Sequence, residues 1–393
     1  MKDFEFCSYT RFIFGHDADK KIGAVLKTEG AKKVMLLHDP GEFLYTSGLL
    51  AAIIGNLEAA GLQVVEKGNV KPNPVISYVE ECLADAKAEQ VDWLLALGGG
   101  SVIDTAKAVA AGAGYDGDLW DLFEGGPGKA DASRKLPIAV VLTNPATGSE
   151  SGYGCMIDNT ELKVKGALTG AGNWLRPEIC FMNPELTYSL PGRLTGMGIV
   201  DMFSHAAERY FSNAELGGLM DYMTEGVLKY LVENGHKCIE NPQDYETRAN
   251  IMWAGSVAHN DTVGIGRGKD MGTHTIAQVL SALYDTPHGI TIAIIMPSWM
   301  RCVYKRDVER FARYAVQVFG VEDGPDREAV ALAGIEATEK WFHDMRCPIG
   351  FIEGNIPTNE LELIAEKAGP KCGRCYPIGA EEILSIVKDA ASR

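Results

Sequence analysis

Apolar and polar positions in the first half of the chain alternate between two patterns. Short, almost uninterrupted apolar runs predict buried strands at 33–38, 62–66, 91–97 and 136–142. Between them, apolar residues spaced three and four positions apart predict helices at 48–60 and 75–89. Buried strands that alternate with helices are typical of a parallel sheet with helical crossovers, so we predict an α/β architecture here.

The pattern changes after about residue 184, where helical spacing continues with almost no strand-like runs. It predicts helices at 222–234, 245–259, 274–283, 308–319 and 328–345. We therefore predict a domain boundary within 183–190. The α/β domain would span residues 1–185, and an all-helical domain would span residues 186–393.

Composition and charge exclude several classes of protein. The chain has 393 residues, 46% of them hydrophobic and 23% charged, which is typical of a globular protein long enough for two cores. A formal net charge of −16 argues against a nucleic-acid partner, because binding phosphates requires clustered lysines and arginines. The first residues lack the pattern of a signal peptide, and no apolar run is long enough to span a bilayer. We expect a cytoplasmic protein without a membrane partner.

The nine cysteines are scattered along the chain, and their number is odd, which favours reduced thiols over a disulfide framework. Cys372 and Cys375 have the spacing of half a zinc knuckle or of a redox dithiol. No second pair of this kind and no thioredoxin-like pattern accompanies them. We therefore interpret this segment as a loop near the surface.

A glycine-rich turn follows the strand predicted at 91–97. The letters Gly98-Gly99-Gly100-Ser101 lead directly into a helical pattern. Glycines let a ligand approach the backbone closely, and the free amides at a helix N-terminus attract phosphate. The turn matches neither G-x-G-x-x-G nor a Walker A loop, and a tight turn that needs small residues would explain the same letters. Phosphate binding and a simple turn both remain open on this evidence.

Polar residues also follow two other predicted strands. Asp39 comes after the strand at 33–38, and the loop 143–150 (TNPATGSE) follows the strand at 136–142. Ligands of open α/β sheets collect at the carboxyl ends of the strands. An acid there can accept hydrogen bonds from ribose hydroxyls and repel a 2′-phosphate, so Asp39 favours NAD(H) over NADP(H).

Four side chains in the second half predict a metal site. Asp201 and His205 are four residues apart in a helical pattern, which places both on one helix face. His274 and His288 would be about 21 Å apart on one straight helix, but Pro287 predicts a break that lets them meet. Each could instead be an ordinary partly buried side chain with a hydrogen-bond partner. As a set in apolar surroundings, one carboxylate and three imidazoles favour Fe²⁺ or Zn²⁺ over Mg²⁺ or Ca²⁺.

Several motifs together resemble the iron-containing, or group III, alcohol dehydrogenases, and in particular their butanol dehydrogenase-like branch. They are GGGSVIDTAK (98–107), TNPATGSES (143–151), NPELTYSLP (183–191), GIVDMFSHAAERY (198–210) and TPHG (286–289). The resemblance covers essentially the whole chain. It implies an N-terminal nucleotide-binding domain and a C-terminal helical domain, with metal and nicotinamide meeting in a cleft between them.

The resemblance also implies residue roles. The implied metal ligands, which would form the catalytic centre, are Asp201, His205, His274 and His288. The implied cofactor-binding residues are Asp39, Gly98, Gly99, Ser101, Asp104, Thr143, Thr147 and Lys165. The match at Lys165 is the loosest, because the segment 163–177 is two residues longer here than in the family pattern.

Two departures from the family pattern matter for function. Many butanol dehydrogenase-like members have glycines, a pattern that goes with NADP(H), where this chain has Asp39 and Pro40. Many relatives also have a second histidine where this chain has Gln278, and glutamine does not titrate near neutral pH. A proton relay through that position is therefore not expected.

These observations lead to three hypotheses. The first is hydride transfer between a short primary alcohol, or its aldehyde, and nicotinamide, with the metal as Lewis acid. The second is a lyase or cyclase of the dehydroquinate-synthase type, which needs several cationic residues for phosphorylated substrates. Near the metal motifs the chain offers mainly Arg209, Arg267 and Lys269. The third is a metal- or nucleotide-binding protein without catalysis. A homodimer is expected from family analogy alone.

Overall fold

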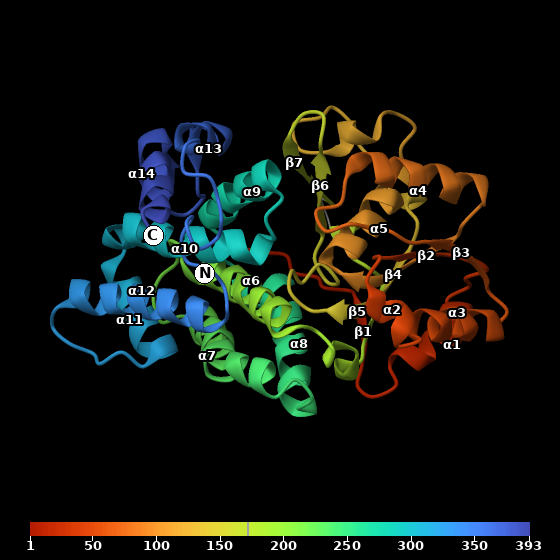
Figure 1. Ribbon diagram of the computed structural model, residues 1–393, viewed down its shortest axis with the longest axis horizontal. Helices are drawn as coiled ribbons and strands as arrows, with labels where there is room; N and C mark the ends of the chain where they lie inside the picture. The colour runs from red at the N-terminus through yellow and green to blue at the C-terminus, as the bar shows by residue number, and fades with distance from the viewer. Residues whose placement is uncertain (171–172) are drawn as a thin grey trace. The chain divides into compact units, whose positions relative to one another are not determined.

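The computed structural model describes residues 1–170 and 173–393, and the chain forms two compact units, coloured red to yellow and green to blue in Figure 1. One unit spans Cys7–Ser189. The other combines Leu190–Arg393 with the N-terminal segment Met1–Phe6. The backbone amide of Lys2 donates to the carbonyl of Gly266 (2.9 Å), which attaches the N-terminal segment to the second unit. The hydrophobic pattern contained no sign of this attachment.

The first unit is built on a six-stranded parallel sheet in the order β1-β8-β5-β4-β2-β3. The strands are β1 (Arg11–Phe14), β2 (Lys33–His38), β3 (Gln63–Lys67), β4 (Trp93–Gly99), β5 (Ile138–Asn144) and β8 (Ile179–Met182). The parallel sheet predicted from the apolar runs is confirmed. The strands β1 and β8 were not predicted, because they are only four residues each and too short to show a period.

Helices cover both faces of this sheet, which explains why its central strands are apolar on both sides. They are α1 (Ile22–Thr28), α2 (Glu42–Thr46), α3 (Leu49–Ala59), α4 (Ile76–Ala88) and α5 (Gly100–Ala113). Leu36 and Leu95 belong to one buried cluster with Ile22 of α1 and Ile53 of α3. In Figure 1, α4 and α5 lie on the opposite side of the sheet from α1 to α3.

A separate antiparallel hairpin, β6 (Gly154–Asn159) and β7 (Val164–Thr169), follows the loop after β5. Its register places Asp158 opposite Lys165. The sequence analysis did not predict it, because both strands mix polar and apolar residues and neither forms a buried run. The hairpin is therefore an antiparallel addition to an otherwise parallel α/β unit.

The second unit is rich in helices, as predicted. The helices are α6 (Gly192–Tyr210), α7 (Leu219–Glu240), α8 (Tyr245–His259), α9 (Gly272–Tyr284), α10 (His288–Val303), α11 (Val308–Phe319), α12 (Arg327–Asp344), α13 (Leu361–Lys367) and α14 (Ala380–Ala391). One detail differs from the all-helical expectation, since β9 (Lys371–Cys372) pairs with β10 (Ile378–Gly379). This short pair forms around the Cys372 to Cys375 turn. Among the described residues, no helix is both long and apolar enough to cross a bilayer.

Helix α6 lies at the centre of the second unit and is buried along most of its length. It packs against α7, α8 and α10, and α10 also packs against α9. On α6, Phe203 contacts an aromatic group that includes Trp341 and Phe342. Burying such large rings gives α6 a firm position in the core. The polar residues of α6 are therefore held by a rigid element.

Candidate metal centre and cofactor site

Three helices bring together the four side chains proposed as metal ligands. Asp201 and His205 lie one turn apart on α6, His274 lies in the first turn of α9, and His288 begins α10. The helix α9 ends before Asp285, whose φ of 49° is left-handed, and Pro287 precedes α10. The chain therefore reverses at the Asp-Thr-Pro segment, as the sequence predicts. The rings of His274 and His288 have centroids 5.2 Å apart.

The distances within this cluster are short. His205 Nε2 is 3.4 Å from Asp201 Oδ1, and His288 Nε2 is 3.8 Å from the same oxygen. Asp201, His205 and His274 each offer one potential metal-ligand atom, and these three atoms lie within 4.8 Å of one another. His288 sits at the open side of the group, with a side chain 23% exposed against 3% for Asp201. The structure thus places three buried side chains, each with a potential metal-ligand atom, close together, with His288 beside them.

Burial makes this arrangement unfavourable unless a bound ligand provides a partner for the polar atoms of the cluster. Within the described residues, Asp201 Oδ1, His205 Nδ1 and His274 Nε2 are buried and take part in no hydrogen bond. Burial raises the pKa of Asp201 to about 6, and burial, with the neighbouring histidines, lowers the pKa of His205 well below its usual value. A buried carboxylate beside neutral imidazoles is the donor set that a divalent transition-metal ion requires. The residues present therefore fit such an ion.

Sequence reasoning missed Glu208, which is completely buried on α6. Its Oε2 is 2.5 Å from Nδ1 of His274. Burial acts to lower the pKa of His274, but the charge and hydrogen bond of Glu208, together with Asp201, raise it overall. A signal was present, because Glu208 lies three residues after His205 and seven after Asp201. That spacing puts all three on one face of a helix.

His259 and Arg209 also border the cluster. The ring centroid of His259, at the end of α8, is 4.5 Å from that of His205. Arg209 donates to the carbonyls of His205 and His259 and to Asp261. The guanidinium therefore holds the end of α8 against α6 and faces internal acceptors.

The proposed cofactor residues in the first unit lie at the carboxyl ends of three neighbouring strands. Asp39 follows β2, Gly98 and Gly99 are the last residues of β4, and Thr143 is the next-to-last residue of β5. Asp39 Oδ1 accepts a hydrogen bond from the amide of Gly41 (2.7 Å). A Cβ on Gly98 would lie 3.3 Å from Asp39 Oδ2, so this carboxylate lies directly beside the glycine turn. This is the edge of a parallel sheet where ligands bind.

The glycine turn packs closely against the loop that follows β5. A Cβ on Gly99 would lie 3.1 Å from the Cβ of Asn144, and one on Gly100 would lie 2.6 Å from Oγ1 of Thr147. Ser101 follows in the first turn of α5. Gly100 was not among the predicted cofactor-binding residues, but its lack of a side chain allows the two loops to approach. The amides at the start of α5 point toward the same edge of the sheet.

Two further residues proposed for cofactor binding make contacts within the protein. Asp104 accepts from Ser149 Oγ (2.6 Å) and from the amide of Met156 (2.9 Å). Lys165, on β7, donates to Asn73 Oδ1 (2.8 Å) and lies 3.7 Å from Asp158 Oδ1. These contacts position the loop 143–150 and the β6–β7 hairpin. Direct roles of Asp104 and Lys165 toward a cofactor stay predictions.

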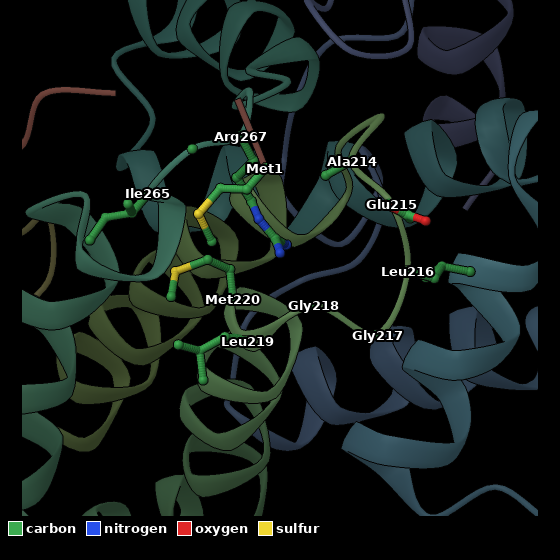
Figure 2. Close-up of a pocket in the computed structure, with 11 residues that line it drawn as sticks. Met1, Ala214, Glu215, Leu216, Gly217, Gly218, Leu219, Met220, Ile265 and Arg267 are labelled. Carbon is green, nitrogen blue, oxygen red and sulfur yellow. The ribbon is translucent and has the colours of Figure 1, made fainter. Parts of the chain in front are cut away.

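A separate surface pocket of about 290 Å³ lies in the second unit (Figure 2). Met1, the segment 214–220 and the segment 265–267 line it. Arg267 is among the lining residues, and its guanidinium is paired with the buried Asp221 at 2.8 Å. None of the proposed metal or cofactor residues lines this pocket.

Comparison with known proteins covers nearly the whole chain. A family model described as iron-containing alcohol dehydrogenase matches residues 9–184, and the model of the C-terminal part of the Fe-containing alcohol dehydrogenase family matches residues 195–391. A probable NADH-dependent butanol dehydrogenase of Bacillus subtilis is 37% identical over 392 residues, which is 99% of each chain. An NADPH-dependent aldehyde reductase of Escherichia coli is 32% identical over 93% of each chain.

A solved structure supports the same relationship. The crystal structure of an NADH-dependent butanol dehydrogenase A from Thermotoga maritima superposes with a TM-score of 0.94 at 35% identity, covering 100% of this chain and 99% of the other. The likeness therefore extends through both units. The family models and these relatives together show that the chain belongs to the iron-containing alcohol dehydrogenase family.

Proposed function

We propose that this protein interconverts short primary alcohols and aldehydes by hydride transfer to and from a nicotinamide cofactor, with NAD(H) preferred. The observation that carries the proposal is the cluster of Asp201, His205 and His274, in which Asp201 Oδ1, His205 Nδ1 and His274 Nε2 are buried and form no hydrogen bond with the described residues. The relatives support the reaction class, since their names describe butanol dehydrogenases and an aldehyde reductase.

Asp201, His205, His274 and His288 would hold the ion, which we propose to be Fe²⁺ or Zn²⁺. When bound, such an ion supplies a Lewis acid for the substrate oxygen. Asp201 contributes the negative charge, and the neutral imidazoles contribute lone pairs without adding charge. The set would therefore leave about one net positive charge at the site, which suits stabilisation of negative charge on the substrate oxygen.

Three strand ends in the first unit would bind the cofactor. The amides at the start of α5 and the turn at Gly98, Gly99 and Ser101 suit a pyrophosphate, because they combine free donors with close backbone approach. Asp39, beside Gly98, would accept hydrogen bonds from the adenosine ribose. Thr143 lies near the end of β5, and Thr147 lies on the loop that follows this strand. The protein would then act mainly by holding cofactor and substrate in place.

Replacing His274 with alanine tests the metal centre. We expect turnover to fall on the order of a hundredfold, because the cluster loses a buried donor. The measurement is a panel of primary alcohols and aldehydes with NADH and NADPH, after metal analysis of protein purified without chelators. His343→Ala is the matched control, since His343 is an exposed histidine paired with Glu353. Unchanged turnover of metal-loaded His274→Ala protein would contradict the proposed centre.

Asp39→Gly tests the cofactor preference. Removing the carboxylate beside Gly98 removes its repulsion of a 2′-phosphate, so we expect the ratio of kcat/KM for NADPH over NADH to rise by about tenfold or more. Glu42→Gly is the control, because it removes a nearby exposed acid in the first turn of α2. An unchanged ratio in Asp39→Gly protein would show that Asp39 does not select the cofactor.

A cyclase of the dehydroquinate-synthase type is not favoured, because the named relatives are dehydrogenases and reductases. Such an enzyme would show no net release of NADH, whereas an alcohol dehydrogenase releases one NADH for each alcohol oxidised. A homodimer, expected from the family resemblance, and a cytoplasmic location, expected from the sequence pattern, also stay predictions. Light scattering of the purified protein tests the oligomeric state.

A further inference from the structure

The start of helix α9 is held by two buried carboxylates, one from Asp270 just before the helix and one from Glu208 on α6. Its first residue follows Met271, which has a left-handed φ of 63° and supplies no side-chain cap. Asp270 Oδ1 accepts from the amide of Gly272 (3.0 Å), and Glu208 Oε1 accepts from the amides of Thr273 (3.0 Å) and His274 (3.3 Å). The free amides of the first turn are thereby satisfied, and the helix dipole favours both negative charges.

The second oxygen of Glu208 contacts the ring of the third residue of that turn. Oε2 lies 2.5 Å from Nδ1 of His274, and a carboxylate only accepts hydrogen bonds. Nδ1 must therefore carry the ring proton, which leaves the lone pair on Nε2. Nε2 is buried and forms no hydrogen bond with the described residues, on the side where His205 and Asp201 lie. The ring is thus oriented by one nitrogen and available through the other.

We propose that Glu208 is the positioning residue of the metal centre, locking α9 to α6 and holding His274 in the tautomer whose Nε2 can bind the ion. This inference rests on the proposed function, because it assigns His274 as a ligand. Glu208 shares its helix face with Asp201 and His205. One rigid helix therefore supplies two ligands and the group that orients a third.

Glu208→Gln separates this role from simple packing. Glutamine has nearly the same shape but offers one acceptor and one donor group. If its carbonyl keeps the bonds to the amides of Thr273 and His274, its NH₂ faces Nδ1, and the ring proton moves to Nε2. The lone pair then points away from the cluster. We expect the affinity for Zn²⁺ to fall about 10- to 100-fold, measured by competition with a chromophoric chelator.

Glu225→Gln is the matched control, with the same substitution at another buried carboxylate of this unit. Glu225 accepts from Tyr210 and Arg313, and neither of these partners is a proposed metal ligand. Its Zn²⁺ affinity should stay near that of the unmodified protein. If Glu225→Gln lowers the affinity as much as Glu208→Gln does, Glu208 acts only through the stability of the fold, and the inference is wrong.

A spectroscopic measurement on the unmodified protein covers the case in which Glu208→Gln does not fold. Nitrogen-15 chemical shifts of the histidine rings in the Zn²⁺-loaded protein, with His274 identified by its absence in His274→Gln, report which nitrogen carries hydrogen. We expect the proton on Nδ1 of His274. A proton on Nε2 would overturn the inference.

Asp201→Asn distinguishes failure of the inference from failure of the proposed function. If Asp201→Asn binds Zn²⁺ as tightly as the unmodified protein, the metal centre itself is misassigned. If Asp201→Asn loses affinity while Glu208→Gln keeps it, the centre stands and the role of Glu208 does not.

Discussion

Lys107 illustrates how one buried side chain holds the loops of the proposed cofactor site. It lies on α5 and is completely buried. Its Nζ donates to Ser149 Oγ (2.9 Å) and to the carbonyls of Gly152 and Gly154 (2.8 Å each). Asp104, one turn earlier on α5, accepts from the same Ser149 hydroxyl. The glycine turn and the loop 143–150 are therefore connected through α5.

Replacing Lys107 with methionine should change the free energy of unfolding by an amount that depends on pH. Burial lowers the pKa of Lys107 to about 8 from its usual value of 10.5, although Asp104 opposes the change. Between these values the unfolded chain binds a proton that the folded protein has released, so folding becomes more favourable as pH rises. Relative to Lys107→Met, the unmodified protein should gain roughly 3 kcal/mol across this range.

The measurement is the difference in unfolding free energy between the two proteins from pH 7 to pH 11, obtained with urea. Tyrosines and cysteines that titrate in the same range are present in both proteins, so their contributions cancel. A difference that does not change with pH would show that Lys107 keeps its proton in its buried position.

At the scale of elements, the turn from β4 into α5 depends on the absence of side chains. A Cβ on Gly98 would lie 2.5 Å from Cγ2 of Val102 in the first turn of α5, and Gly100 faces Thr147. The parallel strands β2, β4 and β5 are neighbours, so their following loops meet at one edge. The local sequence of glycines and the order of strands together produce the proposed phosphate site.

Gly100→Ala should weaken NADH binding about tenfold, because a Cβ there would lie 2.6 Å from Thr147 Oγ1 and 2.8 Å from its Cγ2. One of the two loops has to move to relieve this contact. Calorimetric titration with NADH measures the effect. Gly55→Ala on α3 is the control, since no atom other than those of neighbouring residues in its own helix lies within 4 Å of the added Cβ. Wild-type affinity in Gly100→Ala would show that the loops adjust without cost to the cofactor site.

At the scale of the whole molecule, the two sets of functional residues belong to different units. Asp39, the glycine turn and the loop 143–150 lie within Cys7–Ser189, whereas the metal cluster lies within Leu190–Arg393. Each unit has its own buried cluster of apolar residues. Ligands of the two sites should therefore stabilise different parts of the chain.

Removing the metal should loosen the second unit selectively. Hydrogen exchange of α6, α9 and α10 should speed up after chelation and slow again on addition of Zn²⁺, because binding stabilises by about 2.7 kcal/mol at a hundredfold excess over Kd. The strands β2, β4 and β5 should respond to NADH instead. Equal changes in both units after chelation, or none in α6 and α9, would contradict this assignment.

Much of the architecture could be predicted because it depends on local patterns. The strand at 33–38 and the helices at 245–259 and 308–319 have the bounds observed in the structure. The four-residue strands β1 and β8 and the mixed hairpin β6–β7 could not be predicted, since they owe their conformation to their neighbours. The attachment of Met1–Phe6 to the second unit is a contact between segments far apart in the sequence.

The letters of the chain alone were enough to indicate the elements, the glycine turn and the one-face pairing of Asp201 with His205, because helix and strand periods act over a few residues. Packing in three dimensions was needed to bring His274 to that pair and to place Glu208 against its ring. It was also needed to set Asp39 beside Gly98. Such contacts depend on how α6, α9 and the strands pack. The pattern of residues along the chain does not specify the spatial distance between segments that are far apart in the sequence.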